Sequence, residues 1–339
     1  MSFIMNIRSV AKYESKILVR SWFFRIFTLL AVVFLGFFNF AMMLMEDNFG
    51  LWFAKSVSSN IPYLNLLLLN TGQAVVAVFL SSEFLKRDKK LDTSEVFYVR
   101  PLSNAEYVVG KIWGNLRVFL FLNLLVLAIV LAFNFMASGV TVDLPAYLVY
   151  FFLISIPTLI FIIGLSIFLM LLLKNQALTF ILLLGYIGLT LFYIQDKFYY
   201  LFDYMVYNLP LFKSTIVGFS NLELILNHRA IYFFAGLGFI FFTIFLFKRL
   251  PNARRSHYPW LFLSFCMFLL MVTAGFRHVR SILWEGEMRA LYTSINNKYV
   301  YEPKMAIDYY DISVEQKSET IRSVVGMEGT ALAASEVFI

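Results

Sequence analysis

Residues 146–173 read AYLVYFFLISIPTLIFIIGLSIFLMLLL, a run of twenty-eight residues without a single charged side chain. About 20 consecutive apolar residues are enough for a helix to cross a lipid bilayer. The whole chain has this character, because 60% of its 339 residues are hydrophobic and 14% are charged, against about 45–50% and about 25% in soluble domains. The sequence therefore predicts an all-α polytopic membrane protein.

The flanks of the apolar runs predict how the chain crosses the membrane. Seven runs are long enough to span, at residues 22–45, 61–82, 112–137, 146–173, 177–194, 231–247 and 259–276. If the N-terminus is cytoplasmic, the inside segments hold seventeen of the twenty-eight Lys and Arg residues, and the outside loops before residue 231 hold only four. Those four are Lys55, Lys197, Lys213 and Arg229. Lys and Arg accumulate on the cytoplasmic side, so we expect a cytoplasmic N-terminus and an extracytoplasmic C-terminus. Only Arg277 and Arg280, just after the last run, oppose this orientation.

The first twenty residues predict an amphipathic helix ahead of the first span. Its basic residues recur at every fourth position and share one side of a helix; they are Arg8, Lys12, Lys16 and Arg20. Such a helix lies along a membrane interface. Two interpretations follow: the helix anchors the topology, or it also binds a partner protein.

Between the second and third spans, residues 83–111 read EFLKRDKKLDTSEVFYVRPLSNAEYVVGK and carry eleven charges of both signs. The first part is compatible with a helix, and Pro101 interrupts it. A second helix is predicted to start at Ser103 or Asn104, with Glu106 in its first turn. Mixed charge suits an ordinary solvated loop, and it also suits an interface, where it supplies specificity.

The predicted outside segment 195–230 is too apolar for a plain loop. Pro210 divides it into two apolar pieces, each too short to span. Pieces of about 10–14 apolar residues are typical of re-entrant or interfacial segments. Its aromatic residues suit the membrane–water interface.

The tail at 277–339 changes character after about residue 284, where the sequence predicts β structure. The runs YYDISV (309–314) and ETIRSVVGM (319–327) are rich in β-branched and aromatic residues. Two or three strands are not stable alone. The tail therefore either pairs with another surface or belongs to a larger β-rich domain of which the sequence holds only the start.

Several kinds of chemistry leave no motif in the chain. It has no P-loop and no HExxH, so we expect no enzyme activity, no catalytic residue, no metal and no cofactor in this chain. His228, His257 and His278 lie near span ends without ligand spacing. The net charge of +7 follows the span flanks and does not indicate a nucleic-acid surface.

The predicted spans contain no Asp or Glu, which a proton- or sodium-coupled carrier usually keeps within the membrane. Their main amides in the second and third spans are Asn65, Asn70, Gln73 and Asn123. Hydrogen bonding between helices explains such residues, and lining a transport pathway is the alternative. The chain thus has membrane spans but no motif for an energy source, a combination that indicates a subunit driven by another protein.

The run SSEFLKRDKKLDTSEVFYVRPLSNAEYVVGKIWG (81–114) resembles the first cytoplasmic loop of ABC-2-type transporter permeases. The N-terminal helix, residues 1–21, is similar to that family's elbow helix. The segment 195–230 is similar to its re-entrant hairpin, and residues 22–250 match its six-span core.

This resemblance implies an export permease of a bacterial plasma (inner) membrane, working as a homodimer or with a related permease half. It also implies a separate nucleotide-binding ATPase subunit, which would hold the ATP. The residues expected to contact that subunit are Arg8, Lys12, Glu83, Arg87, Arg100 and Glu106.

The end of the chain departs from the family, because a seventh span (251–276) leads to a tail at 277–339. The tail's IDYYDISVEQKSETIRSVVGMEG (307–329) resembles the start of the β-domain of M1-type aminopeptidases. The alternative function is therefore a membrane anchor that displays an extracytoplasmic peptidase-like β-domain without transport.

Overall fold

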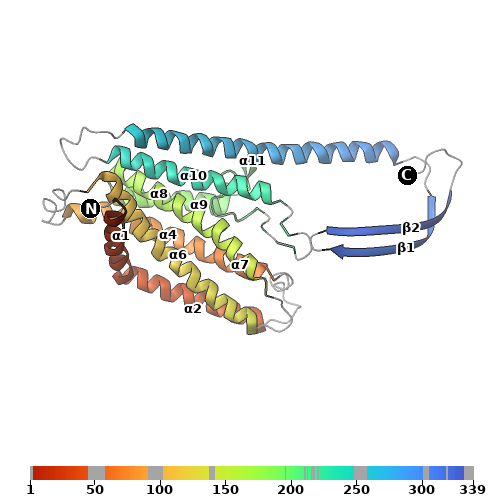
Figure 1. Cartoon of the computed structure of the whole chain (residues 1–339), viewed down its shortest axis with the longest axis horizontal. Helices are drawn as coiled ribbons and strands as arrows, with labels where there is room; N and C mark the ends of the chain where they lie inside the picture. Colours follow the sequence, from red (N-terminus) through yellow and green to blue (C-terminus); the bar gives the residue numbers. More distant parts are fainter. Residues whose placement is uncertain are drawn as a thin grey trace.

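The computed structural model describes most of the chain, and its described part is mainly helical (Figure 1). The described residues are 3–44, 58–90, 102–136, 142–194, 196–209, 211, 213–214, 218–219, 221–247, 258–300, 305–317 and 320–331. Seven helical segments in this part are long and apolar enough to cross a membrane. The prediction of a multi-pass helical protein is confirmed.

The helical elements follow one another as an up-and-down bundle. They are α1 (Phe3–Arg20), α2 (Trp22–Leu44), α4 (Asn60–Lys90), α6 (Asn104–Met136), α7 (Leu144–Tyr150), the π-helical turn η1 (Phe151–Ser155), α8 (Ile156–Leu173), α9 (Gln176–Leu189), the π-helical turn η2 (Thr190–Ile194), α10 (Leu222–Leu246) and α11 (Tyr258–Tyr299). α4 is the central helix and packs against α2, α6, α8 and α9. α1 lies across one end of the bundle, against α6 (Figure 1). We call this the α1 end and the opposite one the far end.

The helices α8 and α10 cross at unusually short range because two glycines meet there. A Cβ atom on Gly164 would lie 2.7 Å from the carbonyl oxygen of Gly236. A Cβ atom on Gly236 would lie 2.7 Å from the backbone of Ile160 and Phe161. Small residues let membrane helices approach closely, so this crossing depends on both glycines. Gly185 has nothing within 4 Å of the position of its absent Cβ.

The last helix differs most from the predicted boundaries. α11 has 42 residues, about 63 Å at roughly 1.5 Å per residue, whereas the hydrocarbon core is about 30 Å thick. Its first part runs antiparallel to α10, where Ser264 donates to the carbonyl of Gly238 at 2.9 Å. The rest extends past the far end as an exposed helix (Figure 1). Residues 277–299 are therefore helix, and the β-rich part of the tail begins only at Met305.

A β-hairpin follows, formed by β1 (Met305–Lys317) and β2 (Thr320–Ala331), paired antiparallel. The strands predicted at 309–314 and 319–327 are confirmed over the described residues. The pairing sets Ile312 opposite Val325 and Tyr310 opposite Met327. Because side chains alternate between the faces of a strand, these four share one apolar face with Val314 and Ile321. Each of the six side chains is between 43% and 62% exposed.

Candidate functional site

At the α1 end, α1 is docked on the first turns of α6. A Cβ atom on Gly110 would lie 2.7 Å from the Cβ of Val10, and one on Gly114 would lie 2.8 Å from the Cβ of Glu14. The two helices therefore pack at short range, as small residues allow. The predicted amphipathic helix is confirmed, and it is fixed to the bundle by one face.

Buried polar contacts add orientation to this packing. The side-chain amide of Asn6 donates to Glu106 Oε1 at 2.8 Å. Lys111 Nζ lies 3.4 Å from Glu14 Oε2, and these two side chains are only 3% and 4% exposed. A buried charge is costly unless it is paired, so the α1–α6 arrangement is strongly specified. A displacement of α1 must therefore move α6 as well.

The other face of α1 is basic and exposed. Arg8, Lys12, Lys16 and Arg20 are all exposed and lie opposite the residues that touch α6. We call these four residues the basic stripe. The partner contact predicted for Arg8 and Lys12 stays a prediction.

The charged stretch 83–111 is helical at both of its ends. α4 continues to Lys90, so Glu83 and Arg87 lie on its extension, but their side chains are outside the described part. Arg100 also lies outside the described residues. α6 begins at Asn104, which confirms the predicted second helix.

Ser103 is the residue that starts α6, through reciprocal hydrogen bonds. The N–H of Glu106 donates to Ser103 Oγ at 3.2 Å, and the N–H of Ser103 donates to Glu106 Oε2 at 2.6 Å. This is a capping box. Both carboxylate oxygens of Glu106 thus accept bonds within the chain, and the geometry gives no support to its predicted contact with a partner.

We expect Ser103→Ala to lower the free energy of unfolding by about 1 kcal/mol, the usual effect of losing an N-cap. Thermal unfolding of the purified protein in detergent measures this change. Ser294→Ala on the exposed part of α11 is the control, and it should change stability by less than about 0.5 kcal/mol. Equal midpoints for the two variants would contradict the capping role.

In the middle of the bundle, the predicted amides form a buried cluster between α4, α6 and η1. Asn70 donates to Asn123 Oδ1 at 3.1 Å and to Ser155 Oγ at 3.2 Å. Asn123 donates to Gln73 Oε1 at 2.9 Å. Asn65 pairs instead with Asn39 of α2, at 2.7 and 3.0 Å. The prediction of hydrogen bonding between helices is confirmed, and the pathway role stays a prediction.

No protein-family model, curated protein or solved structure matches the chain.

The far end is closed by irregular backbone. We call residues 196–221 the cap segment; its described part contains one short 3-10 turn, Phe198–Tyr200, and an isolated bridge between Ser214 and Gly218. Five of its apolar side chains are at most 2% exposed: Tyr204, Met205, Val206, Leu209 and Leu211. Irregular backbone at membrane depth is tolerated where protein covers it. The described part of the cap segment is thus mostly irregular backbone with buried apolar side chains. It contains no helical hairpin of the kind predicted for residues 195–230.

Arg229 fastens the cap segment to the bundle. The sequence places it in an outside loop, but it lies on α10 and is 2% exposed. Its Nε donates to the carbonyl of Leu153 at 2.7 Å and its Nη1 donates to the carbonyl of Tyr204 at 2.8 Å. Pro157 has no N–H to offer the carbonyl four residues earlier, which belongs to Leu153. Arg229 therefore supplies the missing donor inside the π-helical turn.

Two histidines that look isolated in the sequence meet under the cap segment. The rings of His228 and His278 are 5.0 Å apart, and both side chains are fully buried. Their Nε2 atoms lie 3.0 Å from the carbonyl of Tyr200 and 2.9 Å from that of Tyr199. Phe198, Tyr199 and Tyr200 have φ values of 52°, 57° and 63°, a left-handed conformation that costs about 1–2 kcal/mol per residue. The histidines thus hold a strained turn. Within the described residues, no group of three or more His, Cys, Asp or Glu is suited to a metal ion.

The cap segment also contributes a buried carboxyl group, Asp203, which is 0% exposed. Its Oδ2 accepts the N–H of Asn208 at 2.9 Å. Burial raises the pKa of Asp203, although backbone N–H groups and the charge of Arg229 act in the opposite direction. The sequence prediction considered carboxylates only within the spans, and Asp203 lies outside them.

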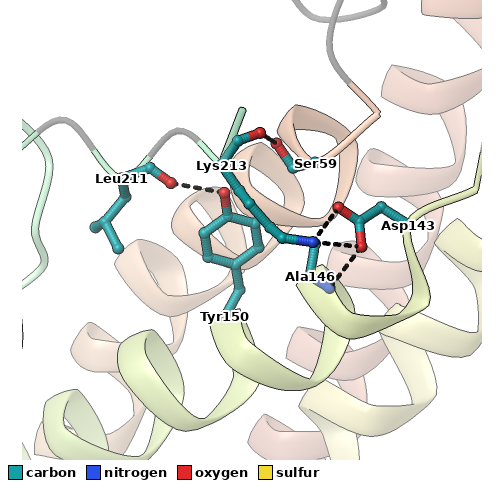
Figure 2. Close-up of polar contacts among 6 residues, drawn as sticks. All are labelled: Ser59, Asp143, Ala146, Tyr150, Leu211 and Lys213. Atoms are coloured by element: carbon teal, nitrogen blue, oxygen red, sulfur yellow. Dashed lines mark hydrogen bonds and ion pairs between the residues drawn. The ribbon is translucent and has the colours of Figure 1, made fainter. Parts of the chain in front are cut away.

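Figure 2 shows where the cap segment meets the starts of α4 and α7. Lys213 Nζ lies 2.7 and 2.9 Å from the carboxylate oxygens of Asp143. The backbone carbonyl of Lys213 accepts a bond from Ser59 Oγ at 2.9 Å. Tyr150 OH donates to the carbonyl of Leu211 at 2.6 Å. We call these three contacts the far-end latch.

Proposed function

We propose that the chain is the membrane-spanning permease subunit of an exporter whose ATP-hydrolysing subunit is a separate protein. The observation that carries this proposal is the docking of α1 on α6. One face of α1 is fixed to a spanning helix by the pairs Asn6–Glu106 and Glu14–Lys111, while its basic stripe stays exposed. A partner that moves α1 therefore moves a helix that runs through the bundle.

The neighbouring charged stretch supports the same role. Residues 83–111 connect the extended end of α4 to the start of α6. A push on this stretch acts on both helices, and α4 and α6 together carry the buried amide cluster. This agrees with the sequence resemblance to ABC-2-type permeases, in which the same region faces the ATPase. The resemblance also predicts a second permease half, either another copy or a related chain.

The proposal predicts co-purification with a soluble P-loop ATPase, driven by the charges at the α1 end. Reversing Arg8 and Lys12 to Glu, or Arg87 and Arg100 to Glu, is expected to reduce the bound ATPase at least about tenfold, because like charges at an interface are strongly unfavourable. A pull-down with quantified ATPase measures this loss. Reversal of the exposed Arg280 at the other end of the molecule is the control. Retention of the ATPase in both double variants would remove this end from the mechanism.

A second function is favoured by the hairpin alone. Its apolar face, which includes Tyr310, Ile312 and Val325, is exposed, and a two-stranded hairpin needs further packing to be stable. We propose as the alternative that α11 displays a β-rich extracytoplasmic domain of which this hairpin is one part. A reading frame encoding more strands and an HExxH motif, together with no ATPase in pull-downs, would favour the anchor over the permease.

A further inference from the structure

The buried amide cluster contains three side-chain amides whose orientations are fixed by their surroundings. The Nδ2 atom of Asn70 lies 2.8 Å from the carbonyl oxygen of Leu66. The Nδ2 atom of Asn123 lies 2.8 Å from the carbonyl oxygen of Phe119. Because a carbonyl oxygen only accepts hydrogen bonds, it is the nitrogen of each amide that faces it. The orientation of Gln73 follows in turn, since its Oε1 accepts a bond from Asn123 Nδ2 at 2.9 Å.

With these orientations, the middle of the cluster is fully hydrogen-bonded and its two edges are not. Asn123 Oδ1 accepts bonds from Asn70 Nδ2 at 3.1 Å and from Ser155 Oγ at 2.8 Å. Both N–H groups of the Asn123 amide also have acceptors. Asn70 Oδ1 and Gln73 Nε2 are buried and have no hydrogen-bond partner among the described residues. The cluster is thus left with one acceptor atom and one donor atom.

The amide pair between α2 and α4 shows that this bundle can satisfy buried amides completely. Asn39 Nδ2 donates to the carbonyl of Leu35 at 2.6 Å and to Asn65 Oδ1 at 2.7 Å. Asn65 Nδ2 donates to the carbonyl of Ile61 at 2.9 Å and to Asn39 Oδ1 at 3.0 Å. Every polar side-chain atom of this pair therefore has a partner. The free donor and acceptor of the amide cluster are a local feature and not a general property of the buried amides.

The two free atoms determine which ligand the cluster can bind. Asn70 and Gln73 are three residues apart on α4 and bond to the same amide, so their end groups are neighbours. None of the hydrogen bonds of the cluster among the described residues involves a charged side chain. A cation would be repelled by the N–H groups of Gln73, and an anion would be repelled by Asn70 Oδ1. A neutral group that donates to one atom and accepts from the other suits both.

We propose that the amide cluster is a binding site for one water molecule, which donates to Asn70 Oδ1 and accepts from Gln73 Nε2. Water is the smallest group with both capacities, and buried waters usually have about 2–4 polar partners. The water completes the hydrogen bonding between α4, α6 and η1. Ser155 reaches the cluster from the π-helical turn η1, and such turns are frequent at functional sites. The water site is a property of this chain alone and does not rest on the proposed function.

The test detects water at the side-chain amides of the unsubstituted protein. The side-chain nitrogens of Asn and Gln are isotope-labelled, and NMR measures magnetisation transfer from water to each NH₂ group of the purified protein in detergent. Transfer through space is separated from hydrogen exchange by its opposite sign in the rotating frame. Gln73→Met and Asn39→Leu identify the signals of these two residues by their loss. Asn39 is the matched control, because its amide is also buried but fully bonded within the chain.

We expect through-space transfer from water to the NH₂ group of Gln73 and none to that of Asn39. Asn70→Leu keeps a similar shape but removes the acceptor, so the transfer to Gln73 should be lost, because a single partner is too few to hold a buried water. Asn39→Leu should leave the transfer to Gln73 unchanged.

Three results would overturn the water site. They are no transfer to Gln73 in the wild type, equal transfer to Gln73 and Asn39, and transfer to Gln73 that persists in folded Asn70→Leu. The first two come from the wild-type protein alone, so the test gives a decision even if Asn70→Leu does not fold.

Discussion

Replacing Arg229 with methionine is expected to lower the free energy of unfolding by about 3–5 kcal/mol, the sum of two or three buried acceptors that lose their donor at about 1–3 kcal/mol each. The carbonyls of Leu153 and Ile154 and the hydroxyl of Thr158 all accept bonds from this one guanidinium. Methionine fills a similar volume but donates nothing. Pro157 removes the N–H that would bond to the carbonyl of Leu153 in a regular α-helix.

The measurement is thermal unfolding in detergent, combined with the fraction of protein that elutes as a single species. Arg229→Lys keeps the charge but not the planar set of donors, so we expect a loss between those of wild type and Arg229→Met. Arg280→Met makes the same chemical change at an exposed position of α11 and should stay within about 0.5 kcal/mol of wild type. An Arg229→Met variant as stable as Arg280→Met would show that the π-helical turn is satisfied in another way.

The start of α10 shows why hydropathy misplaces Arg229. Residues 222–230 read LELILNHRA, and their charged and polar members lower the local hydropathy, so the predicted span begins at residue 231. In the structure this stretch is the first part of α10. The side chains of His228 and Arg229 bond to carbonyls of the cap segment, and Arg229 also bonds to a carbonyl of the π-helical turn. The burial of His228 and Arg229 is explained by these tertiary partners, which no local sequence pattern predicts.

Other features follow from local chemistry. The spacing of Ser103 and Glu106 is by itself the pattern of a capping box. The outer part of α11 also has a sequence pattern typical of a helix, because Glu285 and Arg289 are four residues apart. In the structure, Arg289 Nη2 lies 3.9 Å from Glu285 Oε2. The cap segment is different in kind. Its left-handed turn is held by His228 and His278, which are fifty residues apart in sequence, so its form is a consequence of packing.

The crossing of α8 and α10 should be the most sensitive steric point of the described bundle. Gly236→Ala places a Cβ atom 2.7 Å from backbone atoms of Ile160 and Phe161, which cannot yield by a rotamer change. The helices must separate, and we expect a loss of about 2–3 kcal/mol, at the upper end of typical overpacking costs. Gly185→Ala is the matched control, because its new methyl group meets nothing within 4 Å and alanine favours the helix by up to about 1 kcal/mol.

The same crossing provides a test of mechanism through the pair Gly164 and Gly236. If Gly236→Ala separates the two backbones, the space that a Cβ atom on Gly164 requires is already created. Gly164→Ala should then cost much less in the Gly236→Ala background than in the wild type, because substitutions that share a contact are not additive. Unfolding midpoints of the two single variants and the double variant measure this coupling. If the losses of unfolding free energy in the two single variants add up to the loss in the double variant, each glycine is needed for a separate local reason. The two residues would then not jointly maintain the close crossing.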